Sequence, residues 1–224
     1  MRWTVPNILT IMRLLAAPGL VVMFMYFQRP WADLFALTLF VLAAVTDWFD
    51  GFLARSWNQQ SRFGAMLDPI ADKVMVMIAL FVITGFQGMN PWIMFPATLI
   101  VFREVFVSGL REFLGADAGK LAVTNLAKWK TTAQMVAIAT LFSTGVFEHY
   151  FGMNSFGMDI QMISDTLAGI VPDEMGLRWK YMAMNVSWSL GLGLLWLSAL
   201  LTLWTGWDYL NKALPFLRDP ENLP

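Results

Sequence analysis

The sequence predicts an all-α integral membrane protein, a six-transmembrane-helix bundle with a polar site on one side of the membrane. Hydrophobic residues make up 58% of the 224 residues and charged residues only 14%, with a mean hydropathy of +0.57. Soluble domains are about 25% charged. The chain also contains six mostly apolar stretches that are long enough to cross a bilayer as helices.

The first three expected spans lead into and out of an acidic turn. The first covers residues 7–27, which is about 30 Å as a helix. After a tight turn at 28–30, the second covers 31–55 and ends in two aspartates. The third, 62–86, begins with two more. The turn-rich sequence GFQGMNP follows it and closes this hairpin.

The remaining spans are less regular. The fourth covers 92–114, and the polar sequence GADAGK separates it from the fifth, 124–147. An acidic, extracytoplasmic insertion at 148–180 precedes the sixth span, 181–210. Within it, apolar residues at positions 160, 163, 167 and 170 share one helical face, as in a helix that lies at a membrane interface. We expect a single membrane domain over residues 1–224.

The basic residues predict the orientation. Six spans place both termini on the same side of the membrane. Of the 15 Lys and Arg residues, only Arg29, Arg178 and Lys180 fall on the opposite side. The positive-inside rule therefore predicts that both termini and the acidic turn are cytoplasmic. A net charge of −1 argues against a nucleic-acid partner, which would require a basic face.

Four carboxylates flank the turn between the second and third spans. Asp47 and Asp50 are three residues apart, and Asp68 and Asp72 are four apart, so each pair shares a helical face. If the two helices are antiparallel neighbours, all four carboxylates converge and repel one another. Divalent cations remove this conflict, and carboxylate oxygens suit Mg²⁺ or Mn²⁺. The chain has no Cys and one His, so it offers no competing soft site.

Small residues continue the faces that carry these aspartates. Gly51 and Ala54 follow the first pair, and Gly64 precedes the second by one helical turn. Small side chains let a ligand approach the helices closely. A metal-bridged diphosphate fits such a groove. The carboxylates alone would indicate a transporter as readily as a metal-dependent enzyme.

The pattern D-x2-D-G-x2-A-R-x8-G-x3-D-x3-D resembles the signature of the CDP-alcohol phosphotransferases, integral membrane enzymes of phospholipid synthesis. Every signature position is filled, by Asp47, Asp50, Gly51, Ala54, Arg55, Gly64, Asp68 and Asp72. The resemblance implies that an alcohol displaces CMP from CDP-diacylglycerol with the help of Mg²⁺ or Mn²⁺, as two bound ions. It also implies a homodimer in a bacterial-type cytoplasmic (inner) membrane.

The resemblance also implies roles for individual residues. The metal ligands would be Asp47, Asp50, Asp68 and Asp72, and Asp72 would also act as the catalytic base. The CDP-lipid site would comprise Asn7, Thr10, Gly51, Ala54, Arg55 and Gly64. Asn7, Thr10 and Arg13 are spaced three apart along one face of the first span. Anchoring at the membrane interface is the alternative interpretation of Arg13.

Basic residues near the cytoplasmic ends of the fourth and fifth spans suggest the acceptor. Arg111, Lys128 and Lys130 are expected to bind the phosphate of an acceptor such as sn-glycerol 3-phosphate, since an uncharged amino alcohol would not need them. Positive-inside topology and contact with anionic lipids are the alternative for cytoplasmic lysines, and we prefer it for Lys120. Arg103 could simply pair with Glu104 or with a neighbouring helix.

Two other functions compete with this one. Another member of the same family could use inositol phosphate, serine or choline as its acceptor. A divalent-cation transporter could use the aspartates as its ion site, although such sites are expected near mid-membrane between repeated halves. The aspartates here are expected at one face, and the sequence shows no repeat.

Overall fold

The computed structural model describes residues 4–56, 61–115 and 125–217, which form α-helices and contain no strand. In chain order the helices of these residues are α1 (Val5–Tyr26), α2 (Trp31–Ser56), α3 (Arg62–Phe86), α4 (Pro91–Leu114), α5 (Asn125–Asn154), α6 (Ile160–Ala168) and α7 (Leu177–Leu217). The prediction of an all-α fold is confirmed.

Polar caps and a proline set the starts of α3 and α4. The hydroxyl of Ser61 accepts a hydrogen bond from the backbone N–H of Gly64 at 2.9 Å. The side chain of Asn90 accepts one from the N–H of Trp92 at 3.0 Å, and Pro91 is the first residue of α4. Both arrangements satisfy N–H groups that have no partner within the helix. The turn predicted between the third and fourth spans is therefore observed.

The last two long helices extend beyond the limits that hydropathy predicted. α5 continues to Asn154, through the start of the expected insertion, and α7 runs from Leu177 to Leu217. The carboxylate of Asp173 accepts hydrogen bonds from the N–H groups of Leu177, at 2.7 Å, and Arg178, at 3.0 Å, and so caps α7. Hydropathy marks where a helix is apolar, whereas caps decide where it begins.

The insertion between the last two long helices contains the predicted short helix, α6. Asp159 caps it by accepting a hydrogen bond from the N–H of Met162 at 2.7 Å. It ends at Gly169, whose φ of 88° lies in the left-handed region that favours glycine. Ile160 and Ile170 are exposed. Their contact with lipid stays a prediction.

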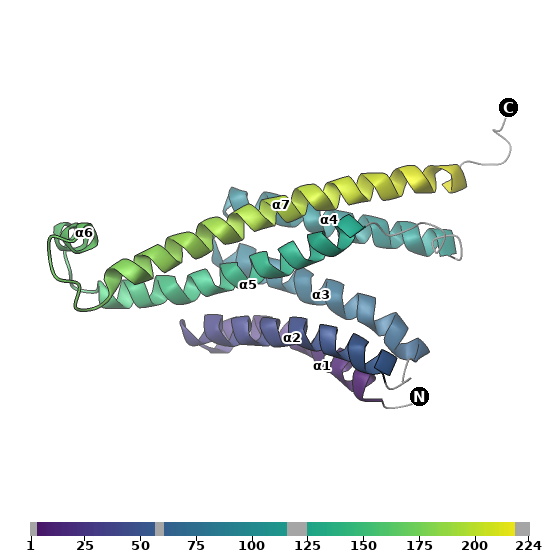
Figure 1. The fold of residues 1–224 in the computed structure, drawn as a ribbon, viewed down its shortest axis with the longest axis horizontal. Coiled ribbons are helices and arrows are strands. Elements are labelled where there is room, and N and C mark those ends of the chain that lie inside the picture. The colour runs from purple at the N-terminus through teal and green to yellow at the C-terminus, as the bar shows by residue number, and fades with distance from the viewer. Residues whose placement is uncertain (1–3, 57–60, 116–124, 218–224) are drawn as a thin grey trace.

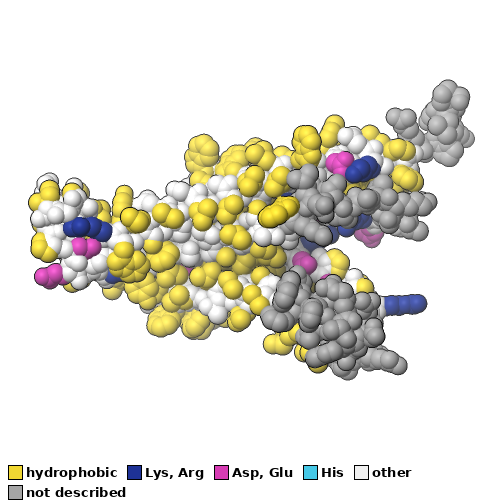
Figure 2. Space-filling view, in the orientation of Figure 1, with side chains coloured by type: hydrophobic (Ala, Val, Ile, Leu, Met, Phe, Trp, Pro, Cys, Tyr) yellow, Lys and Arg dark blue, Asp and Glu magenta, His cyan; other side chains and the backbone are white. Residues whose placement is uncertain are grey.

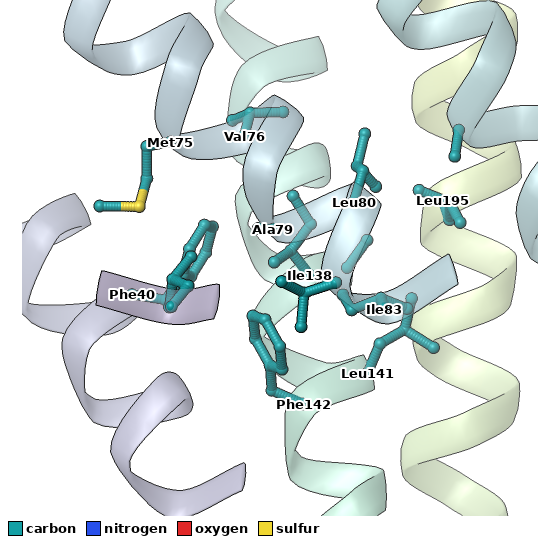
Figure 3. Packing of buried hydrophobic residues seen from close by; sticks show 14 of the residues in the cluster. Phe40, Met75, Val76, Ala79, Leu80, Ile83, Ile138, Leu141, Phe142 and Leu195 are labelled. Atoms are coloured by element: carbon teal, nitrogen blue, oxygen red, sulfur yellow. The ribbon is translucent and has the colours of Figure 1, made fainter. Parts of the chain in front are cut away.

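One hydrophobic core joins α1, α2, α3, α4, α5 and α7. α1 packs against both α2 and α3, and α5 packs along α7 and against α2. In Figure 3, Phe40 of α2 and Met75 of α3 lie in one cluster with Ile138 and Phe142 of α5, and Leu195 of α7 flanks it. This core fixes the relative positions of the helices that carry the candidate site.

Three helices of the described residues are long and apolar enough to cross a membrane: Asn7–Tyr26, Pro91–Leu114 and Leu177–Leu217. The apolar part of α2 is shorter, at Trp31–Thr46. Hydrophobic side chains cover much of the middle of the molecule, and charged ones lie nearer its ends (Figure 2). These features indicate a membrane protein, and the count of six spans stays a prediction.

The polar residues of interest lie at one end of this elongated molecule. α5 and α7 form a long antiparallel pair with α6 at one extremity (Figure 1). The starts of α1 and α3 and the ends of α2, α4 and α7 lie toward the other extremity. We call this second extremity the site end.

Candidate active site

Two carboxylates of α3 meet one face of α1 at the site end. The hydroxyl of Thr10 donates a hydrogen bond to Oδ1 of Asp68 at 2.7 Å. The guanidinium of Arg13 pairs with Oδ1 of Asp72 at 2.6 Å. Arg13 is only 3% exposed, whereas the side chain of Asp72 is 39% exposed. Arg13 is therefore a buried partner of the acidic pair and does not extend to an interface as an anchor.

The start of α3 touches α1 through its glycine. The hydroxyl of Ser61 donates a hydrogen bond to Oδ1 of Asn7 at 2.8 Å, and Asn7 is buried. A Cβ atom at Gly64 would lie 2.7 Å from the same Oδ1. At Gly64, the space that we expected a ligand to use therefore holds the Asn7 amide, itself one of the predicted CDP-lipid contacts.

The remaining signature residues belong to the last turns of α2, which also lie at the site end (Figure 1). They are Asp47, Asp50, Gly51, Ala54 and Arg55, and their side chains lie outside the described residues, as does that of Lys128 in α5. The structure therefore leaves the convergence of all four carboxylates as a prediction.

The two described carboxylates suit a divalent cation. Asp68 and Asp72 lie one helical turn apart, both are partly exposed, and their oxygens are the donors that Mg²⁺ prefers. The bonds from Thr10 and Arg13 hold them in place, as outer hydrogen bonds do for metal ligands. Within 4–56, 61–115 and 125–217, no three described metal-ligating side chains group closely enough to hold an ion. A complete site would need Asp47 and Asp50 as well.

A cavity of about 260 Å³ adjoins Asp72 between α3, α4, α5 and α7. Its ionisable lining consists of the cations Lys73, Arg103, Arg111 and Lys130 and the carboxylates Asp72, Glu104 and Asp208. Among the residues that the structure describes, four cations against three carboxylates leave a small positive excess. This volume lies just below the range of about 300–1,000 Å³ that is usual for small-molecule sites. The cavity therefore suits a small anion better than a lipid.

Glu104 is the centre of an ion network in this cavity. It pairs with the ammonium of Lys130 and with the guanidinium of Arg103, the latter at 3.1 Å. Lys73 donates a hydrogen bond to the hydroxyl of Ser108, which donates to the backbone carbonyl of Glu104 at 2.5 Å. The alternative considered for Arg103, a pairing with Glu104 or with a neighbouring helix, is what the structure shows. Lys130 also has a carboxylate partner, which the sequence did not reveal.

The last turns of α7 form the remaining wall. The guanidinium of Arg111 lies 5.2 Å from the ring centroid of Tyr209. A second hydrogen bond runs from the guanidinium of Arg103 to the hydroxyl of Thr205, at 3.2 Å. Both arginines of α4 are thus held by side chains of α7.

Part of this cavity was predicted from the sequence. Two of the three predicted acceptor residues, Arg111 and Lys130, do line it together. Nine other lining residues with polar side chains had been given neither a catalytic nor an acceptor-binding role: Lys73, Arg103, Glu104, Ser108, Thr131, Gln134, Thr205, Asp208 and Tyr209. The sequence could have indicated Glu104, because an ionisable residue within an apolar membrane span marks a functional site by default. Nothing in the sequence indicated that the residues of α7 line this cavity, since they are about 100 positions from the residues of α4 that they meet.

Comparisons with known proteins agree with this geometry. The family model described as CDP-alcohol phosphatidyltransferase matches residues 3–204. A protein of Cereibacter sphaeroides named CDP-diacylglycerol–glycerol-3-phosphate 3-phosphatidyltransferase is 61% identical over 221 residues, covering 99% of this chain and all of that protein. Proteins of the same name from Salmonella choleraesuis and Shigella flexneri are 45% and 44% identical over 160 residues, covering 70% of this chain and 86% of theirs. The chain therefore belongs to the CDP-alcohol phosphatidyltransferase family.

Proposed function

We propose that this chain transfers the phosphatidyl group of CDP-diacylglycerol to sn-glycerol 3-phosphate, giving phosphatidylglycerophosphate and CMP. The observation that carries the proposal is the position of Asp72. This carboxylate belongs to the aspartate motif and also lines the cationic cavity. Donor and acceptor would therefore meet at its side chain. The names of the relatives support the same pair of substrates.

The donor half of the site would be built on α1, α2 and α3. Asp47, Asp50, Asp68 and Asp72 would hold two Mg²⁺ ions. When bound, such ions neutralise a diphosphate and make it open to attack. Asn7, Thr10, Gly51, Ala54, Arg55 and Gly64 would shape the CDP-lipid site, with Arg55 contacting phosphate.

Asp72 would take the proton in the transfer step. The acceptor hydroxyl attacks the phosphorus that carries diacylglycerol, the bond from that phosphorus to the oxygen of CMP breaks, and the hydroxyl proton passes to Asp72. General bases of this kind contribute roughly 10²–10⁴-fold in rate. The bond from Arg13 holds the carboxylate at the edge of the cavity, where an acceptor hydroxyl could reach it.

The acceptor half would be the cavity itself. Arg111, Lys128 and Lys130 would bind the phosphate of glycerol 3-phosphate. The positive excess among the described residues of the cavity lining favours an acceptor that carries a phosphate over one without a phosphate, such as serine or choline.

We further propose six spans, a homodimer in a bacterial cytoplasmic membrane, and both termini and the site end on the cytoplasmic side. The chain contains no Cys, so single cysteines can report topology. In intact cells, a membrane-impermeant maleimide should label Ser164→Cys in α6 but not Asn211→Cys near the end of α7, which should react only after permeabilisation. The reverse pattern would contradict the proposed orientation.

The deciding experiment is an acceptor panel with the purified protein. CDP-diacylglycerol and Mg²⁺ are mixed with glycerol 3-phosphate, inositol phosphate, serine or choline, and CMP release is measured. We expect release with glycerol 3-phosphate, its loss on adding EDTA, and a fall of at least 10²-fold in Asp72→Asn. Asp159→Asn is the matched control, because Asn caps α6 as well as Asp does. Release with another acceptor alone, or metal flux into vesicles without CDP-lipid, would refute the proposal.

A further inference from the structure

The part of α7 beyond residue 204 lines the cavity although the family match ends there. Thr205, Asp208 and Tyr209 all contribute to the lining. The nearby Gly206 gives Arg103 room, because a Cβ atom there would lie 2.9 Å from Cγ of that arginine. The end of α7 is thus fitted closely to the basic residues of α4.

Tyr209 has an unusual environment. Its side chain is 7% exposed, and its hydroxyl is buried without a hydrogen-bond partner among the described residues. A buried tyrosine hydroxyl usually finds a partner, and leaving one unpaired is costly. A polar ligand in the cavity could supply the missing partner.

The ring of Tyr209 has a second contact. The guanidinium of Arg111 lies 5.2 Å from the ring centroid, within the range of a cation–π interaction. Apart from this contact, Arg111 lies exposed at the wall of the cavity. A long, flexible side chain in such a place would sample many positions without the ring. The ring therefore restricts where the arginine's charge can lie.

We propose that Tyr209 is an acceptor-binding residue, whose hydroxyl donates a hydrogen bond to the phosphate of the acceptor while its ring holds Arg111 against the same group. This inference rests on the proposed function and adds a residue outside the matched family region. Its ligand is a small phosphorylated alcohol, since a buried hydroxyl and a guanidinium side by side suit phosphate oxygens. It involves the acceptor only, so the CDP-lipid should bind independently of it.

The test compares Tyr209→Phe and Tyr209→Leu with the wild-type chain. Tyr209→Phe retains the ring and loses only the hydroxyl. We expect it to raise the KM for glycerol 3-phosphate about tenfold, with the KM for CDP-diacylglycerol within twofold. Tyr209→Leu should raise the acceptor KM further, because Arg111 also loses its ring. Tyr181→Phe, at an exposed tyrosine of α7 far from the cavity, is the matched control and should change neither constant.

A binding measurement separates this inference from the proposed function. Glycerol 3-phosphate should raise the unfolding temperature of the wild-type chain without CDP-lipid present, and raise that of Tyr209→Phe less at equal concentration. If the wild-type chain is active and Tyr209→Phe has an unchanged acceptor KM, the inference alone is wrong. Equal increases in both KM values would show a structural role and would also overturn it. If the wild-type chain neither binds nor uses glycerol 3-phosphate, the proposed function fails as well.

Discussion

Replacing Glu104 by Gln would remove the counter-charge of two buried cations. Glu104 lies between Arg103 and Lys130, and the side chains of all three are largely buried, at 15% exposure or less. Gln has nearly the same shape and can still accept a hydrogen bond. The substitution therefore changes the charge of the network while leaving its packing almost intact.

The structure sets the size of the effect. Two unit charges 3.1 Å apart, as in the Arg103–Glu104 pair, attract by about 5 kcal/mol at an effective dielectric constant of 20. Desolvation of the ions offsets much of this, but removing one partner strands the other charges, which costs about 3–5 kcal/mol in buried pairs. Because Gln still accepts a hydrogen bond, we expect a loss of about 3 kcal/mol in the free energy of unfolding.

A double-mutant cycle with Lys130→Met measures the coupling. The free energy of unfolding in detergent micelles is determined for wild type, Glu104→Gln, Lys130→Met and the double variant. Because the double variant no longer strands Lys130, its loss should fall short of the sum of the single losses by at least about 1 kcal/mol. Asp208→Asn, which breaks an exposed pair with Lys212, should cost only about 0.3–0.5 kcal/mol. Additivity within about 0.5 kcal/mol for Glu104 and Lys130 would refute the network.

Three further predictions test individual contacts. Gly64→Ala should cost about 1–3 kcal/mol in the free energy of unfolding, because its Cβ atom would lie 2.7 Å from Oδ1 of Asn7. In the control Gly85→Ala, in the same helix, the Cβ atom meets nothing within 4 Å and the substitution should cost nothing. Equal costs for the two variants would contradict this prediction. Thr10→Val should raise the Mg²⁺ concentration for half-maximal CMP release about tenfold, because Asp68 loses the hydrogen bond that orients it. The control Thr38→Val, at an exposed position of α2, should leave that concentration unchanged. If Thr10→Val also leaves it unchanged, Thr10 does not orient Asp68 for metal binding. At the cap of α7, hydrogen bonds from backbone N–H groups hold the pKa of Asp173 below its usual 3.8. The ionised carboxylate therefore contributes its full stabilisation at pH values above 3.8, and this contribution is lost as the pH falls through the lowered pKa. The stability advantage of wild type over Asp173→Asn, measured by thermal unfolding, should therefore shrink between pH 5 and pH 3, and a constant difference would exclude the effect.

The local parts of the site could be predicted from the sequence. Helical spacing was enough to place Asp68 and Asp72 on one face, and the same argument placed Thr10 and Arg13 together on α1. The structure shows that these two faces meet. Spacing within a helix does not depend on the rest of the fold, so each of these helical faces could be predicted from the sequence alone.

The contacts between distant helices could not be predicted. Lys130 was expected to face an acceptor, but its partnership with Glu104 depends on how α4 and α5 are placed against each other. Tyr209 meets Arg111 only because α7 packs against α4, and nothing in the local sequence around position 209 indicates that. Helix limits also depended on side-chain caps such as Asp173, which hydropathy does not detect.

The pairing of charges across the site indicates where an anion would bind. Asp72 pairs with Arg13, and Glu104 pairs with Arg103 and Lys130, so these groups largely compensate one another within an apolar surrounding. Two lining cations make no ion pair among the described residues: Lys73, which contacts the hydroxyl of Ser108, and Arg111, which contacts the ring of Tyr209. Their charges are not neutralised there, and both residues line the cavity that Asp72 adjoins. Under the proposed function, the acceptor phosphate that Arg111, Lys128 and Lys130 would bind would also be attracted by Lys73, and its hydroxyl would lie toward Asp72. This would explain why a cationic cavity lies beside an aspartate motif.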